Sequence, residues 1–167
     1  VKRPQIGVLI EVPAAVYQAR LLANEADFMA VGSNDLTQYL LAVDLNNPRV
    51  ADLYKEVHPA VIMALREVAR AVHAEEKPLG ICGELAGTPA GAILLMAMGY
   101  HVLSMNATHL LRVKWVIRNI KRSDARRMLA RVLRMDTAEE VAPFLNKEMV
   151  RLGLSKVMPA RSATQTP

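Results

Sequence analysis

Four short apolar runs, each followed by a helical pattern, restrict the fold of this 167-residue chain more than any other feature of its sequence. They are apolar along most of their length, which is typical of parallel strands that are covered on both faces. Strands that alternate with helices in this way predict an α/β fold with a parallel sheet. The runs cover residues 6–11, 27–32, 79–82 and 102–105.

The segments between and after these runs follow helical patterns. Pro13 stands near the start of the first segment, where a missing N–H group costs least. Asn34 or Asp35 can cap the second helix, and Gly99 is expected to end the helix before the fourth strand. Residues 83–88 are expected to form a loop. The expected helices cover residues 14–25, 35–41, 59–76, 89–98, 107–121, 123–133 and 137–152.

This alternation favours half of a (β/α)₈ barrel. The sequence has no glycine-rich dinucleotide motif and no phosphate-binding P-loop, which argues against a dinucleotide-binding fold. Four βα units over residues 1–122 would form a partial TIM-barrel domain. We expect residues 123–154 to form C-terminal helices packed on the barrel, and residues 155–167 to form a disordered tail. Because the chain begins at Val1 directly before a strand, we expect it to be part of a longer protein.

Side chains suited to chemistry stand at the ends of the first three runs. Glu11 ends the first run, Asn34 and Asp35 follow the second, and Cys82 ends the third. In a (β/α)₈ barrel the active site lies at these carboxyl ends. Two carboxylates on neighbouring strand ends can share Mg²⁺, which completes its shell with water and substrate oxygens. Alternatively, Asp35 only caps a helix and Glu11 forms a salt bridge at the rim.

Cys82 is the only cysteine, so an intrachain disulfide is impossible, and its presence fits a reducing cytosol. A free cysteine is often no more than a small buried hydrophobic residue. Gly80 and Gly83 favour a different interpretation, because they remove side chains close to the thiol and let a ligand approach it. None of the four histidines has metal-ligand spacing, so no function is predicted for them.

The net charge of +5 is unevenly distributed. Residues 112–134 contain nine lysines and arginines and one acid, Asp124, so the rest of the chain is net negative. A nucleic-acid site is one interpretation. Only Trp115 could stack on a base there, which favours a solvated helix face or a surface for an anionic partner. We therefore predict no nucleic-acid partner. No apolar stretch reaches 18 residues, so we predict no membrane partner either.

Three motifs together resemble one protein family. They are "LIEVP" at 9–13, "GSNDLTQYLLAVD" at 32–44 and "ICGELAG" at 81–87. In this order and spacing they resemble the C-terminal barrel of enzyme I, the phosphoenolpyruvate–protein phosphotransferase of the bacterial phosphotransferase system. "NNPRVADLY", with the nearby "HPAV", is most similar to the nitrogen-related form. The resemblance extends from about Gly7 to about Ile120, and it implies the C-terminal half of the phosphoenolpyruvate-binding (β/α)₈ barrel.

The resemblance implies a role for each motif residue. Glu11 and Asp35 correspond to Mg²⁺ ligands, and Asn34, beside Asp35, to a residue that contacts phosphoenolpyruvate. Cys82 corresponds to the cysteine that protonates the substrate's methylene carbon as the enolate becomes pyruvate. A thiol with an ordinary pKa is protonated at neutral pH, as a proton donor must be. The phosphoryl group would pass to a histidine of a separate N-terminal domain and then to an HPr-like phosphocarrier protein, in a cytoplasmic homodimer.

Two positions depart from the family pattern. Leu45 stands where the family has an arginine that clamps the phosphate, and leucine offers neither charge nor donor. Thr88 replaces an acid and is expected to cap a helix instead. Because the resemblance places the acceptor histidine and further substrate-binding arginines upstream, we expect this chain to be inactive by itself.

Two alternatives stay open at this point. Pyruvate phosphate dikinase and phosphoenolpyruvate synthase share the barrel, the acids and the cysteine. They would be expected to read "CGEHGG", where this sequence has Leu85 and Ala86. The other alternative is a non-catalytic fragment with a regulatory or dimerisation role, which Leu45 favours.

Overall fold

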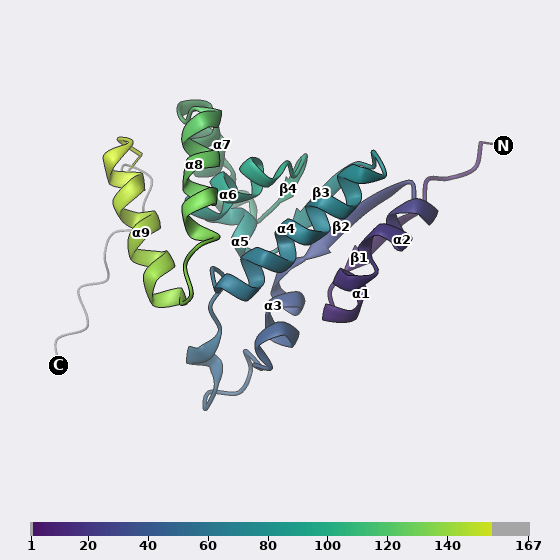
Figure 1. Ribbon diagram of the computed structural model, residues 1–167, viewed down its shortest axis with the longest axis horizontal. Coiled ribbons are helices and arrows are strands. Elements are labelled where there is room, and N and C mark those ends of the chain that lie inside the picture. The colour runs from purple at the N-terminus through teal and green to yellow at the C-terminus, as the bar shows by residue number, and fades with distance from the viewer. Residues whose placement is uncertain (1, 155–167) are drawn as a thin grey trace.

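The computed structural model describes residues 2–154, which form one parallel sheet with helices packed against it (Figure 1). The sheet has the order β1-β2-β3-β4, so each βα unit adds its strand beside the preceding one, as in a (β/α)₈ barrel. This confirms the predicted α/β fold with four βα units. The strands are β1 (Gly7–Ile10), β2 (Phe28–Gly32), β3 (Leu79–Cys82) and β4 (Val102–Ser104).

The helices follow the predicted order. Several of them begin where proline or a capping side chain favours the first turn. Pro13, Pro59 and Pro89 stand in first turns, and the hydroxyl of Thr88 accepts the N–H of Gly91, as a cap requires. The helices are α1 (Pro13–Tyr17), α2 (Ala19–Glu25), α3 (Ser33–Leu41), η1 (Ala51–Leu53), α4 (Pro59–Ala74), α5 (Glu84–Gly87), α6 (Pro89–Met98), α7 (Ala107–Asn119), α8 (Arg122–Val132) and α9 (Ala138–Arg151).

Three local expectations were wrong. The segment 14–25 is two helices, because the chain breaks at Gln18 and turns so that Ala19 and Ala23 are buried on the side of α4. The segment 83–88 is not a loop throughout, since it contains the one-turn helix α5. Neither Asn34 nor Asp35 is a helix cap: α3 begins at Ser33, after Gly32, which places both residues in its first turn.

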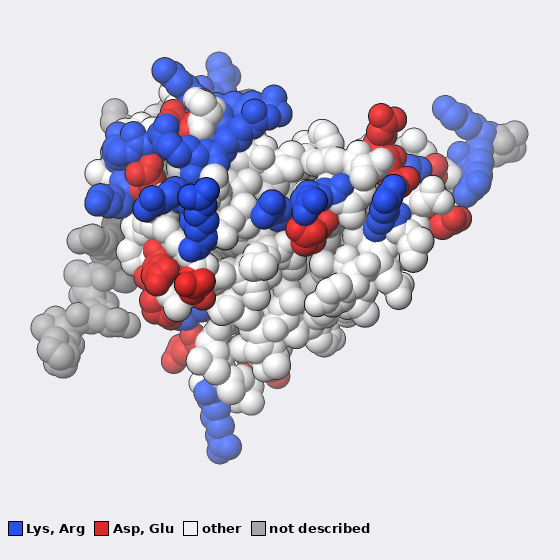
Figure 2. All heavy atoms as spheres, viewed as in Figure 1, with Lys and Arg blue, Asp and Glu red and all other residues white. Residues whose placement is uncertain are grey.

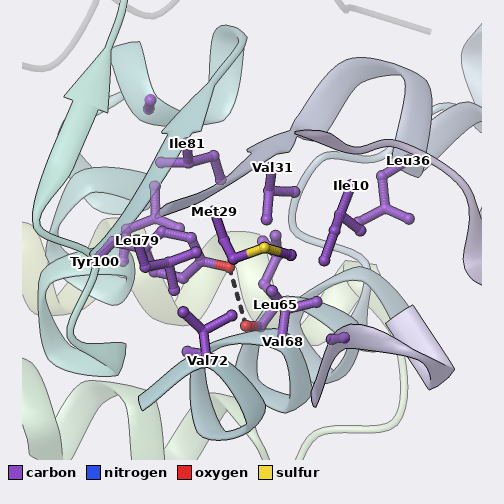
Figure 3. Close-up of a cluster of buried hydrophobic side chains, with 14 of the residues drawn as sticks. Ile10, Met29, Val31, Leu36, Leu65, Val68, Val72, Leu79, Ile81 and Tyr100 are labelled. Carbon is purple, nitrogen blue, oxygen red and sulfur yellow. Dashed lines mark hydrogen bonds between the residues drawn. The ribbon is translucent and has the colours of Figure 1, made fainter. Parts of the chain in front are cut away.

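The first core lies between the sheet and α4. Met29 and Val31 of β2 are buried against Leu65 and Val68 of α4 (Figure 3). Tyr100 is buried in the same core, and its hydroxyl donates to the Leu65 carbonyl at 3.0 Å. This hydrogen bond supplies the partner that a buried phenol needs.

A second core joins the C-terminal helices to the βα units. Leu94 of α6 and Val116 of α7 pack with Met128 of α8 and Leu145 of α9, all of them buried. The C-terminal helices therefore do pack on the βα units. The division of the chain at residue 122 stays a prediction, and the expected tail 155–167 lies outside the described residues.

The opposite face of the sheet is open in the described part of the chain. Leu9, Phe28 and Val102 are 47%, 41% and 60% exposed. Within residues 2–154, four βα units therefore leave this face of the sheet uncovered, as expected of half a barrel. This face corresponds to the interior of a barrel, which four strands cannot close.

No helix within residues 2–154 is long and apolar enough to cross a membrane.

Candidate functional site

The strand register aligns the predicted site residues across one end of the sheet. Gly32 pairs with Cys82, and Cys82 pairs with Ser104. Glu11 is the first residue after β1, and Asn34 and Asp35 lie in the first turn of the helix that follows β2. The structure therefore brings Glu11, Asn34, Asp35 and Cys82 to the carboxyl end of the sheet, where a barrel has its active site.

The Glu11 side chain lies directly over Gly32. A methyl group built on Gly32 would be 2.5 Å from Glu11 Oε1 and 2.8 Å from its Cγ. A residue with any side chain would therefore compete with the Glu11 carboxylate for this space. Gly32 lets the carboxylate cross from the end of β1 to the end of β2, which is the strand that leads into Asp35.

Two hydrogen bonds tie the end of β2 to the end of β3. The Ser33 hydroxyl donates to the Cys82 carbonyl at 2.9 Å, and the Asn34 Oδ1 accepts the N–H of Glu84 at 3.1 Å. Gly83 lies between these two contacts with φ +120°, a backbone conformation that favours glycine. Because the Asn34 oxygen is used in this way, its amide NH₂ group is the part left to donate to a substrate anion.

Gln38 connects Asp35 to the loop that follows α3. Its Nε2 donates to Asp35 Oδ1 at 3.4 Å, and its Oε1 accepts the N–H of Leu45 at 3.0 Å. The Gln38 side chain therefore links the Leu45 backbone to the Asp35 carboxylate. The Leu45 side chain itself is exposed, so a longer residue at this position has solvent space in which to extend.

Cys82 is a half-buried thiol surrounded by carboxylates. Its Sγ donates to the Val31 carbonyl at 3.6 Å, which is a weak hydrogen bond. Burial raises the pKa of the thiol, and the negative charges of Glu11, Asp35 and Glu84 raise it further. The thiol is therefore held in its protonated form at neutral pH, which suits a proton donor and not a nucleophile.

A hollow of about 490 Å³ opens beside Cys82, between α5 and the start of α7. Glu56, Glu84 and His109 are among its lining residues. Burial, and then the charge of Glu84, raises the pKa of the Glu56 carboxyl. Burial, followed by the charge of Glu56, raises the pKa of Tyr54 to about 12. The site is thus lined by acids from four separate segments of the chain.

The donor set fits a Mg²⁺ ion that is shared with a substrate. Within residues 2–154, no group of three or more His, Cys, Asp or Glu side chains is arranged to hold a metal alone. Mg²⁺ commonly uses only one or two protein carboxylates and takes its other ligands from water and phosphate. Glu11 and Asp35, at neighbouring strand ends, meet that requirement. An acidic site of this kind also needs a cation before it can accept an anionic substrate.

Comparison with known proteins identifies the family. The model of the phosphoenolpyruvate-binding domain of phosphoenolpyruvate-utilising enzymes matches residues 1–122. The chain belongs to this family. A Salmonella typhimurium protein named "Phosphoenolpyruvate-dependent phosphotransferase system" is 42% identical over 154 residues, which cover 92% of this chain and 21% of that protein.

Proteins named phosphoenolpyruvate-protein phosphotransferase are also similar to this member of the family. The Haemophilus influenzae protein is 40% identical over 90% of this chain and 26% of its own length. The Geobacillus stearothermophilus protein is 39% identical over 86% of this chain and 25% of its own length. The chain therefore spans about a fifth to a quarter of these relatives. The resemblance to enzyme I is confirmed, whereas assignment to the nitrogen-related form stays a prediction.

Several residues at the site were not predicted from the sequence. Tyr54 ends the quoted stretch "NNPRVADLY" and Glu56 follows two residues later, but no role was predicted for either. Glu84 and Gln38 stand inside the quoted motifs, so their positions were available although no role was given to them. His109, for which no function was predicted, packs over Gly87 at the edge of the hollow.

Proposed function

We propose that this chain supplies part of the phosphoenolpyruvate and Mg²⁺ site of a phosphoenolpyruvate–protein phosphotransferase of the enzyme I type. The observation that carries the proposal is the convergence of Glu11, Asn34, Asp35 and a protonated Cys82 at one end of the sheet. In this proposal Glu11 and Asp35 hold Mg²⁺. The bound ion would neutralise the phosphate and carboxylate of the substrate and stabilise negative charge on the departing enolate.

The protein side chains then have separate tasks. The Asn34 amide donates to a substrate oxygen, and its own oxygen stays on the Glu84 N–H. When the phosphorus–oxygen bond breaks, the phosphoryl group passes to a histidine nitrogen and leaves an enolate. Cys82 gives its thiol proton to the enolate's methylene carbon, which completes pyruvate, and solvent returns a proton to the thiolate. The carboxylates around the thiol favour proton donation to the enolate, because their negative charge keeps Cys82 protonated until the enolate forms.

The remaining parts of the reaction belong to the intact protein. We propose that the acceptor histidine lies in a separate N-terminal domain and that an HPr-like phosphocarrier protein receives the phosphoryl group. We also propose a cytoplasmic homodimer, and that the isolated chain is inactive.

The decisive experiment separates phosphoryl transfer from protonation. In the intact protein, Cys82→Ala should retain phosphoenolpyruvate binding in calorimetry and should still form phosphohistidine in a rapid-quench experiment. Release of pyruvate over many turnovers should be lost, because the enolate lacks its donor. Gly80→Ala, on the same strand, is the matched control and should behave as the unmodified protein, because a methyl group there meets its nearest neighbour at the ordinary distance of 3.5 Å. Loss of substrate binding in Cys82→Ala would contradict the assignment.

Leu45 favours a second candidate, a non-catalytic regulatory or dimerisation role for this site. Leucine cannot bind the phosphate as the expected arginine would. The two hollows at this end of the sheet, near Cys82 and near Asp35, are lined by neither lysine nor arginine. If the unmodified intact protein binds phosphoenolpyruvate with Mg²⁺ but forms no phosphohistidine, this second candidate is correct.

A further inference from the structure

A basic surface covers α7 and α8. All nine of its lysines and arginines are exposed, and Figure 2 shows basic side chains gathered over these two helices. Seven of the nine are arginines, whose planar guanidinium group binds carboxylates in a bidentate manner. The basic surface consists of Arg112, Lys114, Arg118, Lys121, Arg122, Arg126, Arg127, Arg131 and Arg134.

The charges of the basic surface are largely unbalanced within residues 2–154. Only Arg127 forms an ion pair there, with Asp124. Other helices balance their charges locally, as Arg70 does with Glu67 on α4. On α8, by contrast, Arg122 and Arg126 stand four residues apart, a spacing at which like charges repel and destabilise a helix. An ordinary solvated face mixes both signs, so this concentration indicates a surface that meets negative charge.

Exposed aliphatic side chains adjoin the basic surface on α7. Leu110, Leu111 and Ile117 are 51%, 77% and 36% exposed. They lie at helical spacing with Lys114, whereas Val113 and Val116 are buried on the other side of the helix, Val116 in the second core. A face that mixes cations with leucine and isoleucine can bury apolar area against a protein partner. The phosphate backbone of a duplex offers no such apolar area.

The same surface is poorly suited to two other occupants. A single-stranded nucleic acid needs exposed aromatic side chains on which bases stack, but Trp115 is half-buried in the second core. A second copy of this chain in a two-fold contact would place the same nine cations opposite one another, and like charges in such a contact repel. We infer that the basic surface docks an acidic segment of another protein, one that carries apolar side chains among its carboxylates.

The probes for this inference are two labelled acidic peptides and one DNA duplex. Both peptides carry the same number of glutamates; one has leucines at helical spacing and the other has alanines in their place. The duplex has the same total charge. Fluorescence anisotropy with the intact protein, at physiological ionic strength, should give the tightest binding for the leucine peptide. Tighter binding of the duplex, equal binding of the two peptides, or no binding would each overturn the inference.

Charge-reversal variants locate the binding surface. Arg126→Glu, on α8, should weaken binding of the leucine peptide by about fivefold or more, the scale set by one lost ion pair plus a new repulsion. Arg66→Glu changes the net charge equally but lies on α4, where the side chain is exposed and outside the basic surface. It should have a smaller effect. Equal losses in both variants would show attraction to overall charge alone and would overturn the inference. Thermal melting checks folding, and Arg112→Glu replaces Arg126→Glu if the latter does not fold.

Discussion

Replacing Gly32 with alanine tests whether the Glu11 carboxylate must lie against the second strand. Gly32 has φ −88° and ψ 96°, a backbone conformation that alanine adopts without strain. The added methyl group would lie 2.5 Å from Glu11 Oε1, whereas ordinary van der Waals contact begins at 3.4 Å. The Glu11 carboxylate must therefore move by about 1 Å, and its place over β2 is lost.

The effect on activity should be much larger than the effect on stability. The displaced atoms are the end of a flexible, half-exposed side chain, so the fold can accommodate the methyl group. Alanine also recovers about 0.5–1 kcal/mol that glycine costs within a strand. A displacement of about 1 Å in a functional group can reduce activity on the order of 100-fold. We therefore expect kcat/KM at limiting Mg²⁺ to fall by roughly 10- to 100-fold, and Tm to change by a few degrees at most.

Gly80→Ala is the matched control. Gly80 belongs to the neighbouring strand β3, and a methyl group there would meet its nearest neighbour, Val102, at the ordinary distance of 3.5 Å. Steady-state kinetics over a range of Mg²⁺ concentrations should show nearly unchanged activity for this variant of the intact protein. The reasoning fails if Gly32→Ala keeps full activity, if Gly80→Ala loses as much, or if Gly32→Ala loses its activity by unfolding.

Three further predictions concern the same end and face of the sheet. Leu45→Arg in the intact protein should raise kcat/KM for phosphoenolpyruvate by roughly 10- to 100-fold, because a charge-assisted hydrogen bond contributes about 1.5–3 kcal/mol; unchanged steady-state kinetics would show that the loop points elsewhere. Alkylation of Cys82 by iodoacetamide should have its pH midpoint above the ordinary thiol pKa of 9.0, and Glu11→Gln should lower that midpoint because one raising charge is removed. A midpoint insensitive to Glu11 would refute this account. The isolated chain should self-associate or stay partly molten through the open face that carries Leu9 and Phe28, and a monodisperse monomer with a cooperative melt in ultracentrifugation and calorimetry would disprove it.

Much of the fold followed from local signals in the sequence. The strand Leu79–Cys82 and the helix Pro89–Met98 have the predicted bounds. Gly99 ends that helix with φ +94°, a conformation that glycine adopts without strain. Signals of this kind act over a few residues and therefore survive in any tertiary context. The break at Gln18 lacked such a signal, because it follows from how α2 lies on α4.

The motif residues of the candidate site could also be predicted from the sequence. Parallel strands carry their carboxyl ends to one edge, so the position of Glu11, Asp35 and Cys82 after apolar runs was enough to predict their convergence. Tyr54 and Glu56 were not predictable in this way. They reach the site from a loop whose path depends on where α3 ends and α4 begins, and no periodicity encodes that path.

The sequence by itself determined the order of strands and helices, the family and the residue types available for chemistry, since each depends on short motifs. Only the tertiary structure decided how those residues affect one another. It placed the Glu11 carboxylate over Gly32, surrounded the Cys82 thiol with three acids and left Leu9 and Phe28 on an open face. The physical reason is that proximity between residues far apart in the chain is set by strand register and helix packing, which only the folded molecule possesses.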